Sequence, residues 1–240
     1  MADAVPAGVE AFLTQVDAAL GAGYTALLFG SAARGDRVER RSDVNLMLVL
    51  ERVDPAVLRA LHAPFAAWRK VSRTPPILIS RDEWARAADA FPIELSDMRA
   101  AYRVLRGPDL VAGLALDVRD LRRALEHELR GKLLRLRQGY VAHASDPAAL
   151  GALASGSAAT ILLLLRSALV VAGRPVPPAA DALIAAAAEL VGFDAESVRA
   201  PVRRRGDRSP RASAQEFEAY LDAVARTAQF VDHLQPGVEP

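Results

Sequence analysis

The sequence has no cysteine among its 240 residues, which excludes a disulfide scaffold, a zinc ribbon and a thiol catalyst. Lysine occurs only at Lys70 and Lys132, so arginine supplies almost all of the basic residues. Neither sign of charge is in excess, because 30 basic and 29 acidic residues leave a formal net charge of +1. This balance argues against a protein that binds nucleic acid through bulk electrostatics.

Long hydrophobic runs are also missing. The strongest apolar run, 158–165, ends at Arg166 and falls short of the roughly 18 residues that a membrane span requires. The first residues include Asp3 and Glu10, and no basic segment followed by an apolar core is present, so no secretory signal is indicated. We therefore expect a cytoplasmic protein that does not enter a membrane.

The spacing of the apolar residues changes near residue 112. Before that point, short strand-like runs alternate with helical stretches, and after it every segment has helical spacing. At roughly 100–200 residues per domain, the length allows two small domains. We predict an α/β (α+β) domain with a small mixed sheet over 1–112 and an all-α helical bundle over 113–240.

The individual elements are predicted from the same patterns and from the turn residues between them. The first domain is expected to have helices over 9–20, 55–71 and 81–90, and strands over 24–29, 44–50, 77–79, 92–98 and 102–105. The strand 44–50 is apolar on both faces and should lie inside the sheet. The second domain is expected to have four or so helices, over 118–142, 147–172, 181–191 and 214–234. The arginine-rich stretch 199–211 is expected to be an exposed loop.

The stretch 27–50 carries most of the chemistry. It reads as a strand, a Gly30-Ser31 turn that opens a short helix, a basic loop, and a second strand that begins near a carboxylate. Glycine lets a ligand approach the backbone, and the hydroxyl of Ser31 and the first helical amides suit a phosphate. Asp43 and Asn45 are two residues apart on a strand, so both should point to one face. Their oxygens would suit a divalent cation.

At these residues the chain resembles the nucleotidyltransferase superfamily, which includes DNA polymerase beta and kanamycin nucleotidyltransferase. The family motif is an apolar strand, Gly-Ser, a spacer of about nine to thirteen residues, and Asp-x-Asp or Asp-x-Glu between apolar residues. Here eleven residues separate Gly30-Ser31 from Asp43-Val44-Asn45. A weaker similarity over 91–110 and the helical second half agree with the antibiotic-modifying branch of the family.

The resemblance implies that the protein binds a nucleoside triphosphate with Mg²⁺ and transfers a nucleotidyl group to a hydroxyl of a small-molecule acceptor. It also implies a third metal-binding carboxylate on a later strand, for which Glu94 is the first candidate and Asp97 the alternative. Residues three apart on a strand face opposite ways, so only one of the two should reach the site. Arg34 lies in the loop that would face phosphate.

The second domain contributes two further candidates. In the kanamycin nucleotidyltransferase branch, a glutamate near the start of the helical domain is the general base, and a nearby lysine contacts phosphate. The resemblance assigns these roles to Glu128 and Lys132, which share one helical face because they are four residues apart. An ordinary intrahelical ion pair between them is the alternative.

The departure from the family is Asn45, which stands where the second metal-binding carboxylate is expected. Losing one charge about 4 Å from a cation is worth on the order of 4 kcal/mol at an effective dielectric constant near 20. Asn45 therefore keeps two alternatives open: an inactive nucleotide-binding or interaction module with the same fold, and an antitoxin-like subunit. Nucleic acid is an unlikely partner, and a homodimer is compatible with the sequence.

Overall fold

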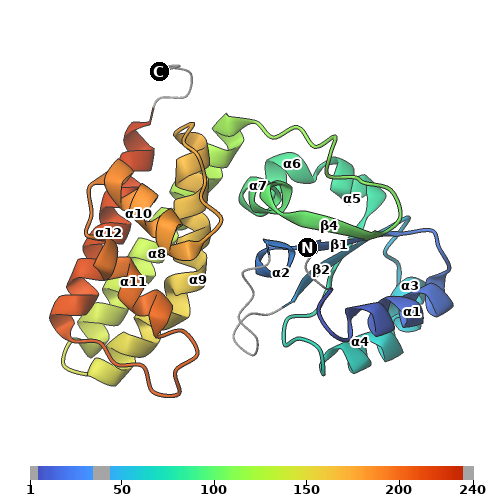
Figure 1. Cartoon of the computed structure of the whole chain (residues 1–240), viewed down its shortest axis with the longest axis horizontal. Helices are drawn as coiled ribbons and strands as arrows, with labels where there is room; N and C mark the ends of the chain where they lie inside the picture. The colour runs from blue at the N-terminus through green and yellow to red at the C-terminus, as the bar shows by residue number, and fades with distance from the viewer. Residues whose placement is uncertain (1–4, 35–43, 235–240) are drawn as a thin grey trace. The chain divides into compact units, whose positions relative to one another are not determined.

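The structure is a computed structural model that describes residues 5–34 and 44–234. The chain divides into two compact units, Met1–Leu116 and Asp117–Pro240. Figure 1 shows that the first unit contains all the strands and that the second consists of helices. The protein is therefore of the mixed α/β kind, with a small sheet and a largely helical chain.

The first unit is built on a four-stranded sheet of order β3-β2-β1-β4. Strand β1 (Thr25–Phe29) pairs antiparallel with β2 (Asn45–Leu50) on one side and with β4 (Tyr102–Arg106) on the other. Strand β3 (Ile77–Ser80) runs parallel to β2, so the sheet is mixed. The inner position predicted for the apolar strand 44–50 is confirmed.

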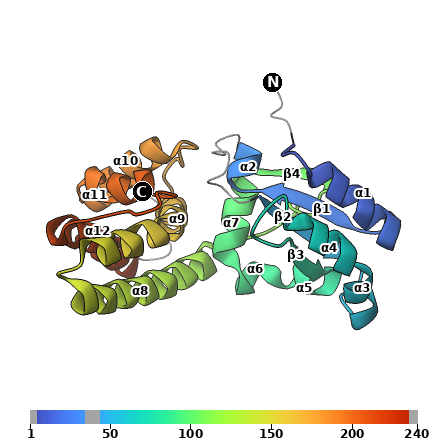
Figure 2. The ribbon, with the colours of Figure 1, turned by 90° about the horizontal axis from the view of Figure 1, so that it is seen from below.

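Helices cover both faces of this sheet (Figure 2). Because alternate residues of a strand point to opposite faces, Leu28 and Leu48 pack with one helical layer and Leu27 and Val49 with the other. The first layer contains α1 (Val9–Leu20), α3 (Pro55–Ala60) and α4 (His62–Trp68). The second contains α5 (Arg81–Ala85), α6 (Ala87–Ala90) and α7 (Pro92–Ala100). A single helix was expected over 55–71 and another over 81–90, and each of these segments instead forms two shorter helices.

Helix α7 corrects the strand predicted over 92–98. Proline suits the first turn of a helix because its ring fixes φ and its missing N–H would have no helical partner there. Pro92 occupies this position, and Leu95 and Met98 then bury one helical face in the core below the sheet. The alternation of Ile93, Glu94 and Leu95 resembles a strand only over three residues, which is too short to decide between the two periods.

The second unit contains five helices within 117–234: α8 (Val118–His143), α9 (Pro147–Val171), α10 (Ala180–Val191), α11 (Ala195–Arg203) and α12 (Ala214–His233). Helix α9 packs against each of the other four, which explains why it is so apolar. Four of these helices lie where the sequence predicts them. The prediction that this half of the chain is a bundle of helices is confirmed.

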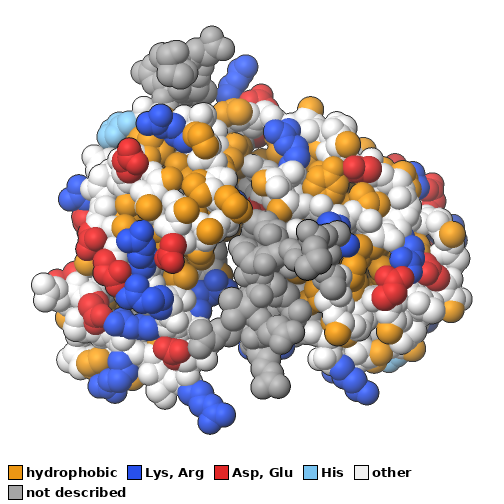
Figure 3. Space-filling view, viewed as in Figure 1, with side chains coloured by type: hydrophobic (Ala, Val, Ile, Leu, Met, Phe, Trp, Pro, Cys, Tyr) orange, Lys and Arg blue, Asp and Glu red, His pale blue; other side chains and the backbone are white. Residues whose placement is uncertain are grey.

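Helix α11 was not predicted, because the stretch 199–211 was expected to be a loop. Asp194 caps the helix by accepting a hydrogen bond from the backbone N–H of Glu196 at 3.0 Å. Val198 and Pro201 are buried on its inner side. Arg203 and Arg204 form ion pairs with Glu196 and with Glu216 of α12. Acidic and basic side chains accordingly lie next to one another on the face of this unit seen in Figure 3.

Helix α9 also corrects the expectation about membrane spans. Among the residues that the structure describes, it is the one helix whose length and composition would allow it to cross a membrane. A core helix of a soluble protein can meet the same test, and Leu150, Ala158 and Leu164 of α9 are buried within the unit. Arg166 is buried as well, and its guanidinium donates a hydrogen bond to the carbonyl oxygen of Pro177 at 3.3 Å.

Candidate functional site

The candidate site lies at the end of the sheet where β1 finishes and β2 begins. Helix α2 (Ser31–Arg34) follows directly after Gly30, so the predicted order of strand, Gly-Ser turn and short helix is confirmed for the described backbone. The antiparallel register pairs Phe29 with Asn45, which brings the first residue of β2 beside this turn. We call the position of Gly30 and Asn45 the β1–β2 corner.

Gly30 is required at this corner for two reasons. Its φ of 73° lies in the left-handed region, which side chains other than glycine seldom adopt. A β-carbon at Gly30 would also lie 2.8 Å from Nδ2 of Asn45. The backbone N–H of Gly30 donates to the carbonyl oxygen of Ala101 at 3.3 Å, which ties the turn to the segment before β4.

The amide of Asn45 is half-buried, and within 5–34 and 44–234 no residue forms a hydrogen bond with it. Fully buried polar groups nearly always have such a partner, whereas a half-buried amide can also bond to water. The oxygen and the NH₂ group of this amide are therefore available to a ligand or to water. Asn45 shares its sheet face with Phe29, and on that face Phe29 pairs with Tyr102.

Tyr102 is a corner residue that the sequence did not indicate. Its hydroxyl donates a hydrogen bond to Oδ2 of Asp109 at 2.9 Å, and this bond raises the pKa of Tyr102. The other oxygen of Asp109 accepts bonds from the backbone N–H groups of Val111 and Ala112 at 2.9 and 3.1 Å. The order β1-β4 cannot be deduced from local spacing, so no sequence signal linked Tyr102 to Gly30.

Several predicted site residues lie at the limits of the described chain. Asp43 lies outside the described residues. Ser31 and Arg34 are the first and last residues of α2, and the structure describes their backbone only. The predicted shared face of Asp43 and Asn45 therefore stays a prediction.

Glu94 does not lie on a strand, in contrast to the expectation. It lies in the first turn of α7, where it is exposed, and Asp97 follows it on the same helix. Residues three apart on a helix are neighbours, so the reason for choosing only one of the two carboxylates no longer holds. Within the described ranges, no three His, Cys, Asp or Glu side chains form a group that could hold a metal ion.

Glu128 and Lys132 lie one turn apart on α8, in the second unit. Both are half-buried, and no ion pair within 4.0 Å joins them to each other or to any residue of the described chain. Glu126, by contrast, pairs with Arg122 at 3.4 Å and with Arg130 at 3.0 Å. The intrahelical ion pair that was the alternative for Glu128 and Lys132 is therefore not formed.

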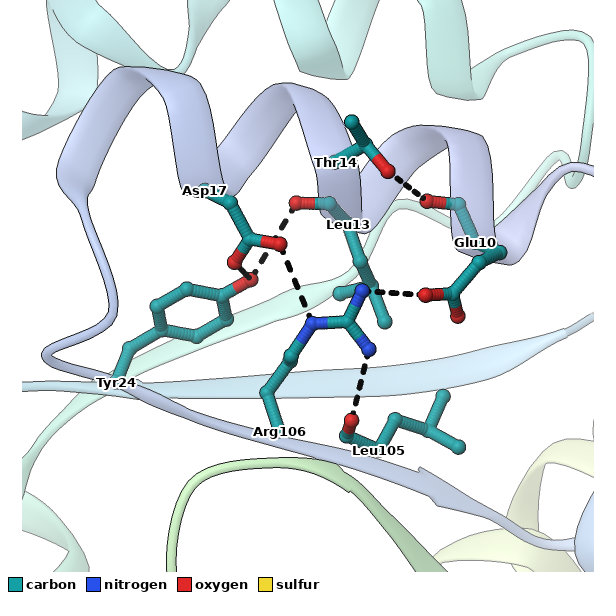
Figure 4. A network of polar contacts seen from close by, with 7 residues as sticks. All are labelled: Glu10, Leu13, Thr14, Asp17, Tyr24, Leu105 and Arg106. Carbon is teal, nitrogen blue, oxygen red and sulfur yellow. Dashed lines mark hydrogen bonds and ion pairs between the residues drawn. The ribbon is translucent and has the colours of Figure 1, made fainter.

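At the opposite end of the sheet, polar side chains bond to one another in a network (Figure 4). The hydroxyl of Tyr24 donates to Oδ1 of Asp17 at 2.7 Å, and Nε of Arg106 donates to Oδ2 of the same carboxylate at 3.2 Å. Arg106 also forms an ion pair with Glu10. Burial is the main reason that the pKa of Tyr24 is raised, and the hydrogen bond to Asp17 adds to it. The hydrogen bond to Glu10 raises the pKa of Arg106. This network fastens α1 to the edge strand β4.

Comparison with known proteins does not assign the chain to a family. No protein-family model matches the sequence, and no curated protein matches it.

Proposed function

We propose that the protein is a nucleotidyltransferase that binds a nucleoside triphosphate at the β1–β2 corner and transfers its nucleotidyl group to a hydroxyl of a small-molecule acceptor. The observation that carries this proposal is the half-buried amide of Asn45, which lies against Gly30 and has no hydrogen-bond partner in the described chain. A strand, a Gly-Ser turn and a second strand with a polar residue at its start are the features on which the family resemblance rests.

In the proposed reaction the acceptor hydroxyl oxygen attacks the α-phosphorus of the triphosphate. The bond from that phosphorus to the bridging oxygen breaks, and pyrophosphate leaves with the electron pair. A general base takes the proton of the hydroxyl. The family resemblance assigns this role to Glu128 of the second unit, which is half-buried and has no ion-pair partner in the described chain. Ser31 and Arg34 are proposed to contact the phosphates, and the family resemblance assigns a phosphate contact to Lys132 of the second unit.

Mg²⁺ is proposed as the ion that accompanies the triphosphate. The amide oxygen of Asn45 and the exposed carboxylate of Glu94 are hard oxygen ligands of the type that Mg²⁺ accepts, and Asp43 would add a third. When bound, the ion would neutralise charge on the phosphate oxygens. Asp97 is the alternative to Glu94.

The test is a transfer assay with radiolabelled ATP, CTP, GTP and UTP against pooled hydroxylated acceptors, with Mg²⁺. We expect a labelled product from the wild-type protein, more product from Asn45→Asp and much less from Asn45→Ala. Glu94→Gln and Asp97→Asn form a matched pair that decides which carboxylate is used. Absence of transfer by both the wild-type protein and Asn45→Asp would refute the proposal.

A second candidate is a nucleotide-binding module without catalysis, which the amide at position 45 favours because it carries no charge toward a cation. Calorimetry separates the two candidates. A module of this kind binds nucleotide equally well with Mg²⁺ and with a chelator, whereas the enzyme binds tightly only with the ion. We also propose that the protein is cytoplasmic, since buried residues of α9 pack within the helical unit.

A further inference from the structure

An open surface groove with a volume of about 290 Å³ lies between two helices of the second unit, α8 and α9. Its volume is at the lower end of the roughly 300–1,000 Å³ that is usual for small-molecule sites. Seven residues line it: Lys132, Arg135 and Leu136 from α8, and Ala152, Leu153, Gly156 and Ser157 from α9. We call it the α8–α9 groove.

Gly156 keeps the groove open. It lies inside a helix of 25 residues, where glycine is unfavourable compared with alanine. Two other glycines of these helices are explained by packing: a β-carbon at Gly139 would lie 2.7 Å from Leu153, and one at Gly151 would overlap the backbone of Pro210. A β-carbon at Gly156 would meet no atom within 4 Å. Packing therefore does not require glycine at this exposed position, and a larger side chain there would extend into the space beside it.

The groove has two cations at its rim and no carboxylate among its lining residues. Lys132 and Arg135 are neighbours because they are three residues apart on α8. Nε of Arg135 donates to the carbonyl oxygen of Gly131 at 3.2 Å, and in the described chain neither cation has an acidic partner.

Other arginines of the same helix are neutralised by carboxylates. Arg122 and Arg130 pair with Glu126, and Arg123 pairs with Asp120. The two cations at the groove are therefore not simply part of a helix rich in ion pairs. Beside them, Leu136 and Leu153 supply an apolar wall.

We infer that the α8–α9 groove binds a small organic anion with an apolar body, such as a carboxylate or a phosphate monoester on a short hydrocarbon chain. The anionic head contacts Lys132 and Arg135, and the chain lies along Leu136 and Leu153 over Gly156. The inference shares Lys132 with the phosphate contact proposed above. It differs from the proposed function in its ligand, which is an anion with an apolar body rather than a nucleoside triphosphate.

The test is a fluorescence titration of the full chain with 1-anilinonaphthalene-8-sulfonate, an anion with an apolar body, followed by displacement with octanoate and with hexyl phosphate. We expect one saturable site from which both compounds displace the probe. Lys132→Gln and Arg135→Gln should each weaken binding about tenfold, as expected for loss of a hydrogen bond to a charged group. Arg137→Gln, which changes an exposed arginine of α8 outside the groove, should bind like the wild-type protein.

Filling the groove tests its shape. Gly156→Leu should abolish binding, and Gly156→Ala should weaken it while raising the melting temperature, since alanine favours the helix. Circular dichroism shows whether each variant is folded. The inference is overturned if folded Gly156→Ala and Gly156→Leu bind the probe like the wild-type protein. It is also overturned if 1-octanol competes as well as octanoate, or if only ATP or inorganic phosphate displaces the probe.

Discussion

At the start of β1, the hydroxyl of Tyr24 and the guanidinium of Arg106 share the carboxylate of Asp17, whereas at the end of the same strand the amide of Asn45 lies against Gly30 without a partner in the described chain. Polar groups that satisfy one another stabilise a fold and leave little capacity to bind anything else. A half-buried amide without a partner contributes little to stability and keeps its capacity for a ligand. The two ends of one strand thus separate structural polar groups from those suited to binding.

The largest effect is expected for Gly107→Ala, at the end of the sheet that carries the network. Gly107 has a φ of 71°, and a β-carbon there would overlap the backbone carbonyl oxygen of Tyr24. We expect a loss of about 3 kcal/mol of unfolding free energy, measured by urea denaturation, from the positive φ and the clash together. Gly192→Ala is the control, because Gly192 has a φ of 83° and no atom within 4 Å. A loss no larger than that of the control would contradict the expectation.

Gly30→Ala should cost less, about 1–2 kcal/mol, mainly from its positive φ. Here the β-carbon would meet the side chain of Asn45, which can shift, rather than backbone. Nucleotide binding should fall at the same time, because the amide is displaced. In the double variant with Asn45→Ala, the clash is absent and part of the stability should return. Strict additivity of the two single effects would show that Gly30 and Asn45 do not interact.

Tyr24→Phe and Tyr102→Phe compare hydroxyl groups at the two ends of the sheet. The first variant loses a bond to Asp17 from a buried ring, and we expect a loss of about 1 kcal/mol in unfolding free energy. The second loses a bond to Asp109 at a more exposed position, so its loss should be smaller. Equal losses would remove the contrast between the two ends.

The contribution of the Tyr24 hydroxyl to stability can also be measured through its dependence on pH. Its pKa is raised above the ordinary 10.0 by burial and by Asp17. Above pH 10 the unfolded chain therefore releases this proton before the folded chain does, and the stability that the phenol contributes is lost as the pH rises. Unfolding free energy should fall less steeply above pH 10 in Tyr24→Phe. Tyr220→Phe in the second unit should show the same change, because burial also raises the pKa of Tyr220. An unchanged slope in Tyr24→Phe would contradict the expectation.

The smallest effect on stability is expected for Asn45→Ala, below about 0.5 kcal/mol, because no hydrogen bond within the described chain is lost. Nucleotide binding, measured by calorimetry, should nevertheless fall clearly. A variant that is strongly destabilised, or one that binds nucleotide like the wild-type protein, would place Asn45 among the structural residues.

Local patterns predicted the corner well, because β1, Gly30 and β2 lie close together in the sequence and their apolar runs are bounded by a glycine and by polar residues. The interpretation of 92–98 as a strand was wrong because the alternation of Ile93, Glu94 and Leu95 is too short to exclude a helix, in which Leu95 and Met98 are buried together. The stretch 199–211 contains Pro201, which is unfavourable inside a helix. The N-cap Asp194 and the buried Val198 nevertheless stabilise α11 there.

Long-range contacts could not be predicted from the sequence. Asp17 and Arg106 are 89 residues apart, and only the pairing of β1 with β4 brings them together. Tyr102 reaches the corner by the same pairing. The α8–α9 groove could not be predicted either, because the sequence shows that residue 156 is glycine but not whether its neighbours leave space beside it.

Within residues 5–34 and 44–234, the order β3-β2-β1-β4 leaves two strands with one unpaired backbone edge each, where another chain could add in a growing aggregate. Strand β3 has only four residues and follows Pro75 and Pro76, which cannot donate the hydrogen bonds that would extend it. The short β3 edge therefore offers little backbone to a second chain, whereas β4, with five residues and its Arg106 paired to Glu10 and Asp17, is the edge at which addition of a strand is easier.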